Sequence, residues 1–175
     1  MGDTVVHPRH GAGRVVSQRR RRMLGAAARD YLEIELDDAA LRIMVPCDTA
    51  RSVGLRAVVG KRQMQLIVDV LEGDREVDPA SWSARQRHYR EKLKGGDVLE
   101  LAAVIRDLAL RDADSGLPRT DRDVYERSRQ LLASELRHAL GVDADRATAY
   151  IDEHVAARPL AAGSGSRCGV RGRAA

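Results

Sequence analysis

The chain has 175 residues, which is enough for one ordinary domain or two small ones. It contains no phenylalanine and one tryptophan, and its two cysteines are too few for the disulfide framework of a small secreted protein. It has neither an apolar run long enough to span a membrane nor a charged and then apolar leader, so we expect a cytoplasmic protein without a membrane partner.

The formal net charge of +4 comes entirely from the C-terminal tail. Residues 158–175 contain four arginines and no acid, so the charges of residues 1–157 sum to zero. Any basic surface outside the tail must therefore be local. The Gly/Ser/Ala/Arg composition of the tail predicts a disordered segment.

The first 55 residues predict a small β module. Four short runs rich in β-formers, 4–7, 13–17, 31–36 and 41–45, are separated by turn residues. Apolar and acidic residues alternate clearly in the third run, as in a strand with one buried face. Residues 37–40 predict the turn of a hairpin. Four or five short strands around one small core favour a compact barrel.

From residue 58 onward the apolar residues follow helical spacing, which predicts a helical bundle over residues 60–157. Ser83, Asp97 and Thr120 stand where helix caps are expected, each with a Gln, Glu or Asp three residues later. Gly141 is placed to end the longest helix, and Asp143 begins the last one. The fold class is therefore α+β, a β module followed by an all-α bundle.

The tryptophan, Trp82, stands just before the expected cap of a basic helix. Residues 85–94 hold five cations and one acid, a composition suited to phosphate contacts or simply to a solvated helix face. A hydrophobic staple would need an apolar partner for Trp82 at the fourth helical position, which is Arg87. A wedge beside nucleic acid and a place in the core both remain open for this ring.

Catalytic and cofactor signatures are absent from the sequence. There is no phosphate-binding Gly-x-x-x-x-Gly-Lys loop, and His7 and His10 have no acidic or cysteine partner at ligand spacing. The other histidines have no serine or cysteine beside them in a nucleophile setting. We therefore expect a binding protein rather than an enzyme, with no cofactor and no metal.

Six segments in a fixed order carry a family resemblance. They are residues 2–13, 42–46, 52–56, 82–85, 103–108 and 116–118. In these segments the chain resembles the bacterial CarD/CdnL transcription regulators, whose first domain is shared with the transcription-repair coupling factor. The resemblance spans about residues 2–156.

The resemblance implies a Tudor-like barrel that docks on the β subunit of RNA polymerase, and a helical domain that contacts promoter DNA at the upstream edge of the melted bubble. The family's tryptophan wedges into the minor groove and stabilises the open complex, which implies this role for Trp82. The implied DNA contacts are Trp82, Arg85, Arg87 and Arg122. The implied polymerase contacts are Arg21, Arg42, Ile43 and Met44, of which the last three suit strand addition to a partner sheet.

Two other functions remain open at this point. The helical part could be a sequence-specific repressor, or the whole chain could be an interaction adaptor in which Trp82 is a core residue. The resemblance favours a monomer that reaches the nucleoid through RNA polymerase and binds DNA with little sequence preference.

Overall fold

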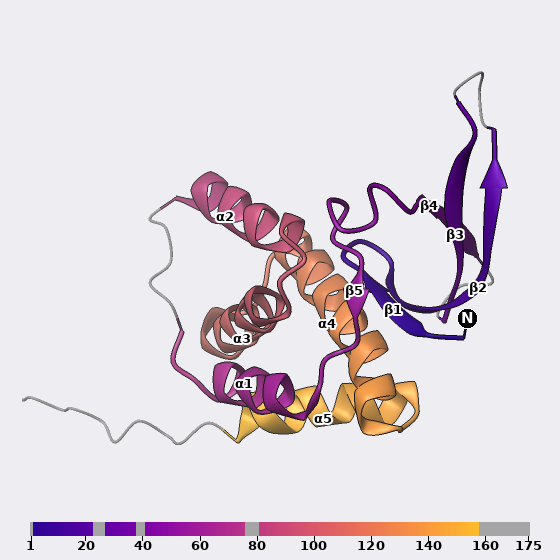
Figure 1. The fold of residues 1–175 in the computed structure, drawn as a ribbon. Helices are drawn as coiled ribbons and strands as arrows, with labels where there is room; N and C mark the ends of the chain where they lie inside the picture. Colours follow the sequence, from indigo (N-terminus) through magenta and orange to yellow (C-terminus); the bar gives the residue numbers. More distant parts are fainter. Residues whose placement is uncertain (1, 23–26, 38–40, 76–80, 158–175) are drawn as a thin grey trace, which may run out of the picture.

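The computed structural model describes residues 2–22, 27–37, 41–75 and 81–157, and within these ranges it holds a β-sheet followed by five helices. The sheet lies on one flank of the helices, with α4 beside it (Figure 1). This arrangement confirms the α+β class. The predicted disordered tail lies outside the described residues. The strands are β1 (Thr4–His7), β2 (Gly11–Arg21), β3 (Arg29–Leu36), β4 (Arg42–Pro46) and β5 (Arg56–Ala57).

The sheet is antiparallel throughout, with the strand order β4-β3-β2-β1-β5. The backbone N–H of Leu36 donates to the carbonyl of Leu41 at 3.0 Å, so β3 and β4 form the predicted hairpin around residues 38–40, which are not described. β5, a strand of two residues, was not predicted. β4 and β5 are the two edges, and no pairing joins them within the described ranges. The predicted closed barrel is therefore not confirmed.

The end of β2 and the start of β3 form a ribbon that projects away from the helices (Figure 1). It carries Arg19, Arg20 and Arg21, all exposed, at the end of β2. The sequence predicted this strand over residues 13–17 and the arginines after it at the end of a ribbon and the start of its loop. Pairing with β3 extends the strand regardless, since ladder hydrogen bonds require only backbone groups.

One face of the sheet is apolar and forms a small core. The buried side chains alternate along β3 as predicted, with Ile34 1% and Leu36 6% exposed. Val15 from β2 and Val45 from β4 complete this cluster.

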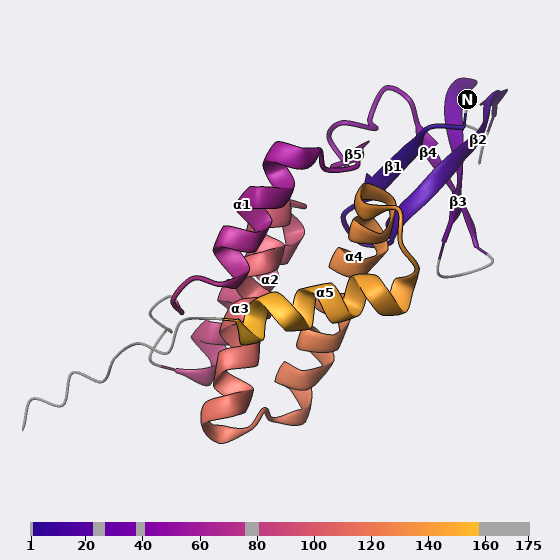
Figure 2. The same cartoon turned by 90° about the horizontal axis from the view of Figure 1, so that it is seen from below.

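The helices enclose a second core around α3. The helices are α1 (Lys61–Leu71), α2 (Trp82–Lys94), α3 (Val98–Ser115), α4 (Arg119–Leu140) and α5 (Ala144–Ala156). Residues 102–108 of α3 are all buried, because α1, α2 and α4 pack around this helix. α5 runs back across α4 and contacts α1 (Figure 2). The central side chains of this core are Ile67, Leu71, Ile105, Leu132, Leu136 and Ile151.

Several predicted helix ends are confirmed. Asp97 accepts a hydrogen bond from the N–H of Leu99 at 2.8 Å, and Asp143 accepts one from Arg146 at 2.7 Å. Gly141 adopts the left-handed conformation that ends α4, with φ of 68°. The start of α4 was wrongly predicted at Thr120, because the helix begins at Arg119 after Pro118 without a side-chain cap. No helix in the described ranges is long and apolar enough to cross a bilayer.

Candidate functional site

Trp82 is the first residue of α2 and is about half exposed to solvent. The side chain of Ser81 accepts a hydrogen bond from the N–H of Ala84 at 3.3 Å, so Ser81 caps the helix and the predicted cap at Ser83 is wrong. Trp82 is 52% exposed, more than any other large apolar side chain in the described residues. This exposure does not fit a core residue and leaves the indole accessible to a partner.

The rest of α2 has one cationic face and one buried face. Arg87, Arg90 and Lys94 are exposed at spacings of three and four residues, which places them along one side of the helix. Arg85 is only 8% exposed, so it does not share this surface, and its Nε atom has no hydrogen-bond partner among the described residues. The buried face consists of Arg85, Gln86 and Tyr89.

A buried polar contact joins the start of α2 to the start of α4. The side-chain amide of Gln86 donates to the Oδ1 atom of Asp121, whose side chain is fully buried. Gln86 lies about one helical turn, roughly 5.4 Å, beyond Trp82. Arg122 follows Asp121 and is exposed, with the Oδ1 atom of Asp112 at 3.9 Å. Trp82 and Arg122 therefore occupy the same end of the helical region.

Sequence reasoning identified Trp82 and Arg122 but missed the pair that brings them together. Gln86 was interpreted as part of a local capping box, and Asp121 was not singled out. The signal available in the sequence was their shared position, since each lies in the first two turns of a long helix. A tertiary contact between two such positions requires the packing of α2 on α4, which residue spacing does not specify.

The edge strand β4 has backbone groups that face outward. The N–H of Cys47 donates to the carbonyl of Asp30 at 2.9 Å, and Leu36 bonds to Leu41 as described above. In an antiparallel pair, every second residue of a strand directs its N–H and C=O groups toward the neighbouring strand. In β4 these are the odd-numbered residues, whose backbone groups therefore face β3. The N–H and C=O groups of Arg42 and Met44 then point to the unpaired edge. Pro46 also faces this edge and has no N–H to leave unsatisfied.

Three of the four predicted polymerase contacts lie on the outer face of the sheet. Cross-strand register places Arg21, Arg42 and Met44 on this face, whereas Ile43 packs against the sheet core. Ser17 on β2 pairs with Glu33 on β3, and Glu33 pairs with Met44 on β4. Arg21 lies four residues beyond Ser17 on β2. Arg21 and Met44 are therefore separated by about 13 Å along the strand direction.

Charges on this outer face are partly paired. The guanidinium of Arg42 donates to Glu35 Oε1 at 3.0 Å and 3.2 Å, which raises the pKa of Arg42. The hydroxyl of Ser17 donates to Glu33 at 2.6 Å, and together with Arg42 it lowers the pKa of that carboxyl. Both acids are thus satisfied within the sheet, and the arginines at the ribbon end remain exposed beyond them.

His7 and His10, at the turn between β1 and β2, lie close together. The rings of His7 and His10 lie 4.8 Å apart between centroids, and His7 Nδ1 accepts a hydrogen bond from the N–H of Arg9 at 3.2 Å. Among the described residues no group of three or more His, Cys, Asp or Glu side chains could hold a metal ion.

Two family models match consecutive parts of the chain. The model described as "CarD-like/TRCF RID domain" matches residues 1–59, which contain the whole sheet. The model described as "CarD, C-terminal domain" matches residues 66–152, which contain most of the helical region. The chain belongs to the CarD family. The first match ends between β5 and α1, and the second begins within α1, so the two CarD matches divide the chain where the sheet gives way to the helices.

A curated relative supports the same assignment. This CarD-family chain is 24% identical over 142 residues to the Bacillus subtilis (strain 168) protein named "Putative transcription factor YdeB", and the match covers 81% of this chain and 92% of that protein. The CarD family is one of transcription regulators rather than of enzymes. The family therefore indicates that the protein takes part in the regulation of transcription.

Proposed function

We propose that this CarD-family protein binds the β subunit of RNA polymerase and promoter DNA at the same time, and so stabilises the open complex. A regulator of this kind shifts the equilibrium by contacting the open state better than the closed one. The observation that carries the proposal is the exposed indole of Trp82 at the first turn of a helix with a cationic face.

The proposed DNA surface consists of Trp82, Arg87 and Arg122. An apolar side chain can fill the gap at an unstacked base step in the minor groove, and guanidinium groups beside it neutralise phosphates without reading sequence. Arg85 is predicted by resemblance as a further contact. Its burial favours a role beneath this surface, on the buried face of α2.

The proposed polymerase surface is the open edge of β4 together with the outer face of the sheet. The outward N–H and C=O groups of Arg42 and Met44 can extend a partner's sheet by strand addition, and their exposed side chains would supply selectivity. Arg21 would contribute a more distant charge from β2. The match of residues 1–59 to a domain shared with the coupling factor supports a polymerase partner for this edge.

A sequence-specific repressor is the less favoured function. Base readout needs side chains that place donors and acceptors against base edges. The exposed face of α2 instead offers long cations, which suit phosphates. We infer a monomer with weak intrinsic DNA affinity that is located in the cytoplasm and brought to promoters by polymerase.

The proposal is tested by comparing the wild type with Trp82→Ala in a promoter-opening assay with purified polymerase. The variant should bind polymerase normally but lose the stabilisation of the open complex. Equal open-complex lifetimes with the two proteins would refute the wedge.

A further inference from the structure

Helix α4 has a second stripe of residues that faces the sheet rather than the helical core, and Ser134 and Glu135 are buried at its centre. Its members are spaced by three or four residues and are mostly polar, in contrast to the apolar stripe of Leu132 and Leu136 on the core side. Each polar member makes a hydrogen bond or ion pair with a backbone or side-chain group in the first 59 residues. The stripe comprises Arg127, Leu131, Ser134, Glu135 and His138.

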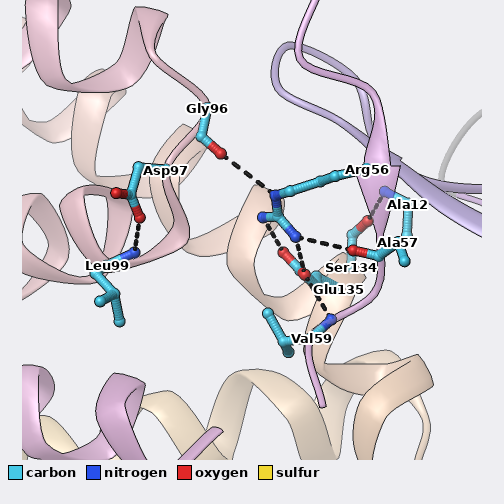
Figure 3. Close-up of polar contacts among 9 residues, drawn as sticks. All are labelled: Ala12, Arg56, Ala57, Val59, Gly96, Asp97, Leu99, Ser134 and Glu135. Atoms are coloured by element: carbon cyan, nitrogen blue, oxygen red, sulfur yellow. Dashed lines mark hydrogen bonds and ion pairs between the residues drawn. The ribbon is translucent and has the colours of Figure 1, made fainter. Parts of the chain in front are cut away.

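Glu135 is the centre of this junction (Figure 3). Its side chain is 1% exposed, and both oxygens accept hydrogen bonds from the guanidinium of Arg56, at 2.5 Å and 2.8 Å. Oε1 also accepts the backbone N–H of Val59 at 3.0 Å. A carboxylate so deeply buried is tolerated only when its partners are fixed in good geometry. The pair therefore ties β5 and the segment after it to the C-terminal part of α4.

A neutral hydrogen bond lies beside the ion pair. The backbone N–H of Ala12, at the start of β2, donates to Ser134 Oγ at 2.6 Å in a buried setting (Figure 3). Gly11 leaves room for this approach, because a Cβ atom there would lie 2.5 Å from Ser134 Oγ. The contacts at Ser134 and Glu135 fix two different strands against one helix.

The same junction reaches the base of α2. The Nε atom of Arg56 donates to the carbonyl of Gly96 at 3.4 Å, just beyond the last residue of α2 (Figure 3). Gly96, with φ of 69°, also leaves room for Pro8, since a Cβ at this position would lie 2.7 Å from the ring of Pro8. Arg56 therefore contacts both α4 and the end of α2.

From these contacts we propose that Arg56 and Glu135 form a clamp that fixes the direction of α2, and hence the position of Trp82, relative to the sheet. Trp82 lies at the far end of α2, roughly 20 Å from the clamped end for a helix of this length. A tilt of about 10° at the clamp would displace Trp82 by roughly 3.5 Å over that length. Arg56 and Glu135 are in this sense positioning residues.

The existence of the clamp does not depend on the proposed function, but its effect on transcription rests on that function. A regulator that must reach polymerase and a DNA step together benefits when the distance between its two surfaces is fixed before binding. Whether the clamp makes the sheet and α2 one rigid unit can be measured on the isolated protein. Whether that rigidity matters needs polymerase and promoter.

The structural measurement is the distance distribution between spin labels at Arg14→Cys on β2 and Glu91→Cys on α2, in a background with Cys47→Ser and Cys168→Ser. The wild-type clamp should give one narrow distribution. Glu135→Gln, Arg56→Met and the double variant should each broaden it. The matched control is Arg146→Met with Glu153→Gln, an ion pair at 2.6 Å that lies within α5 alone, and it should leave the distribution unchanged.

A second kind of variant loosens the contact between the sheet and α4 but keeps the charges of Arg56 and Glu135. Gly11→Ala introduces a methyl group against Ser134 Oγ and should also broaden the distribution. It keeps the proposal testable if a buried-charge variant fails to fold, which circular dichroism would detect. Distributions as narrow as the wild type in folded Arg56→Met and Gly11→Ala would overturn the clamp.

The functional readout is open-complex lifetime. Clamp variants should retain wild-type affinity for the isolated β subunit, while the lifetime falls about fivefold or more, at the lower end of usual coupling strengths. A broadened distribution with an unchanged lifetime would overturn the positioning role. If the wild type itself gave no longer lifetime than polymerase alone, the proposed function would fail, and the label distances would still decide whether the clamp exists.

Discussion

Gln86 and Asp121, which are 35 residues apart in the chain, join the starts of α2 and α4 through a hydrogen bond between a buried amide and a fully buried carboxylate. Arg111 contributes an ion pair to the same carboxylate, with its Nε atom 4.0 Å from Oδ2. Because Trp82 lies one turn before Gln86, this contact supports the surface proposed to meet DNA.

Asp121→Ala should destabilise the helical region and loosen the first turn of α2. The variant leaves the buried amide of Gln86 without its acceptor, a loss of about 1–3 kcal/mol in the free energy of unfolding. Denaturant unfolding measures this loss, and Trp82 fluorescence anisotropy should fall in the folded state. Asp123→Ala, at an exposed position on the same helix, is the control and should change neither. Equal stabilities of the two variants would contradict the support role.

Arg87→Ala and Arg122→Ala should each weaken DNA binding and make it less sensitive to salt. A contact with one phosphate contributes about 0.9 to the slope of log affinity against log salt concentration, so each variant should lower the slope by about one. Titrations of a labelled duplex at several salt concentrations measure this. Arg62→Ala, on the exposed surface of α1, should leave the slope unchanged. A slope that stays at the wild-type value in both site variants would exclude direct phosphate contacts.

Met44→Pro should weaken binding to the polymerase β subunit while keeping the sheet intact. The N–H of Met44 faces the open edge and not β3, so proline removes a donor for strand addition without removing a ladder hydrogen bond. Met44→Ala retains the N–H and separates the backbone effect from the side chain. Pull-down affinities should follow the order wild type, then Met44→Ala, then Met44→Pro. If Met44→Pro bound as well as Met44→Ala, strand addition at β4 would be wrong.

The stability of the first turn should fall in mild acid because of His7. Burial, together with His10 and Arg9, lowers the pKa of His7 below its ordinary value of 6.5. At a pH between the two pKa values, His7 is protonated in the unfolded chain but not in the folded chain. Protonation therefore favours the unfolded state, and His7 reduces the stability of the protein as the pH falls from about 6.5 through the folded pKa. Protonation also ends the acceptance of the Arg9 N–H at Nδ1.

His7→Gln should remove this component. The melting temperature of the variant should depend less on pH than that of the wild type below about pH 6.5, the pH range set by the ordinary histidine pKa. Well above that range the two proteins should respond to pH in the same way. Parallel curves over the whole acid range would show that His7 carries no such coupling.

Local signals in the sequence predicted much of the fold. The alternation in β3, the caps at Asp97 and Asp143, and the glycine that ends α4 each depend on a few neighbouring residues, and each is confirmed. The cap of α2 was misplaced because Ser81 and Ser83 are both competent caps, and only Ser83 is followed at the right spacing by glutamine. That glutamine is used instead in a tertiary contact.

The features that position the site depend on contacts between distant residues. Ser134 and Glu135 are polar residues in a helix and would ordinarily face solvent. Their burial requires the sheet to pack on α4, which no local pattern encodes. Arg85 is a similar case, since its place among exposed cations in the sequence predicts exposure, whereas the packing of α2 buries it. Trp82 is the converse, an apolar residue that remains exposed.

The most direct measurement is the lifetime of the promoter open complex with wild-type protein, Trp82→Ala and the exposed apolar control Leu66→Ala, which is 43% exposed on α1. Both substitutions are at the surface and should change folding stability little, within about 1 kcal/mol. Trp82→Ala should shorten the lifetime by about tenfold, equivalent to about 1.4 kcal/mol, while Leu66→Ala should match the wild type. A lifetime with Trp82→Ala equal to that with the wild type, at equal occupancy of polymerase, would contradict the central claim.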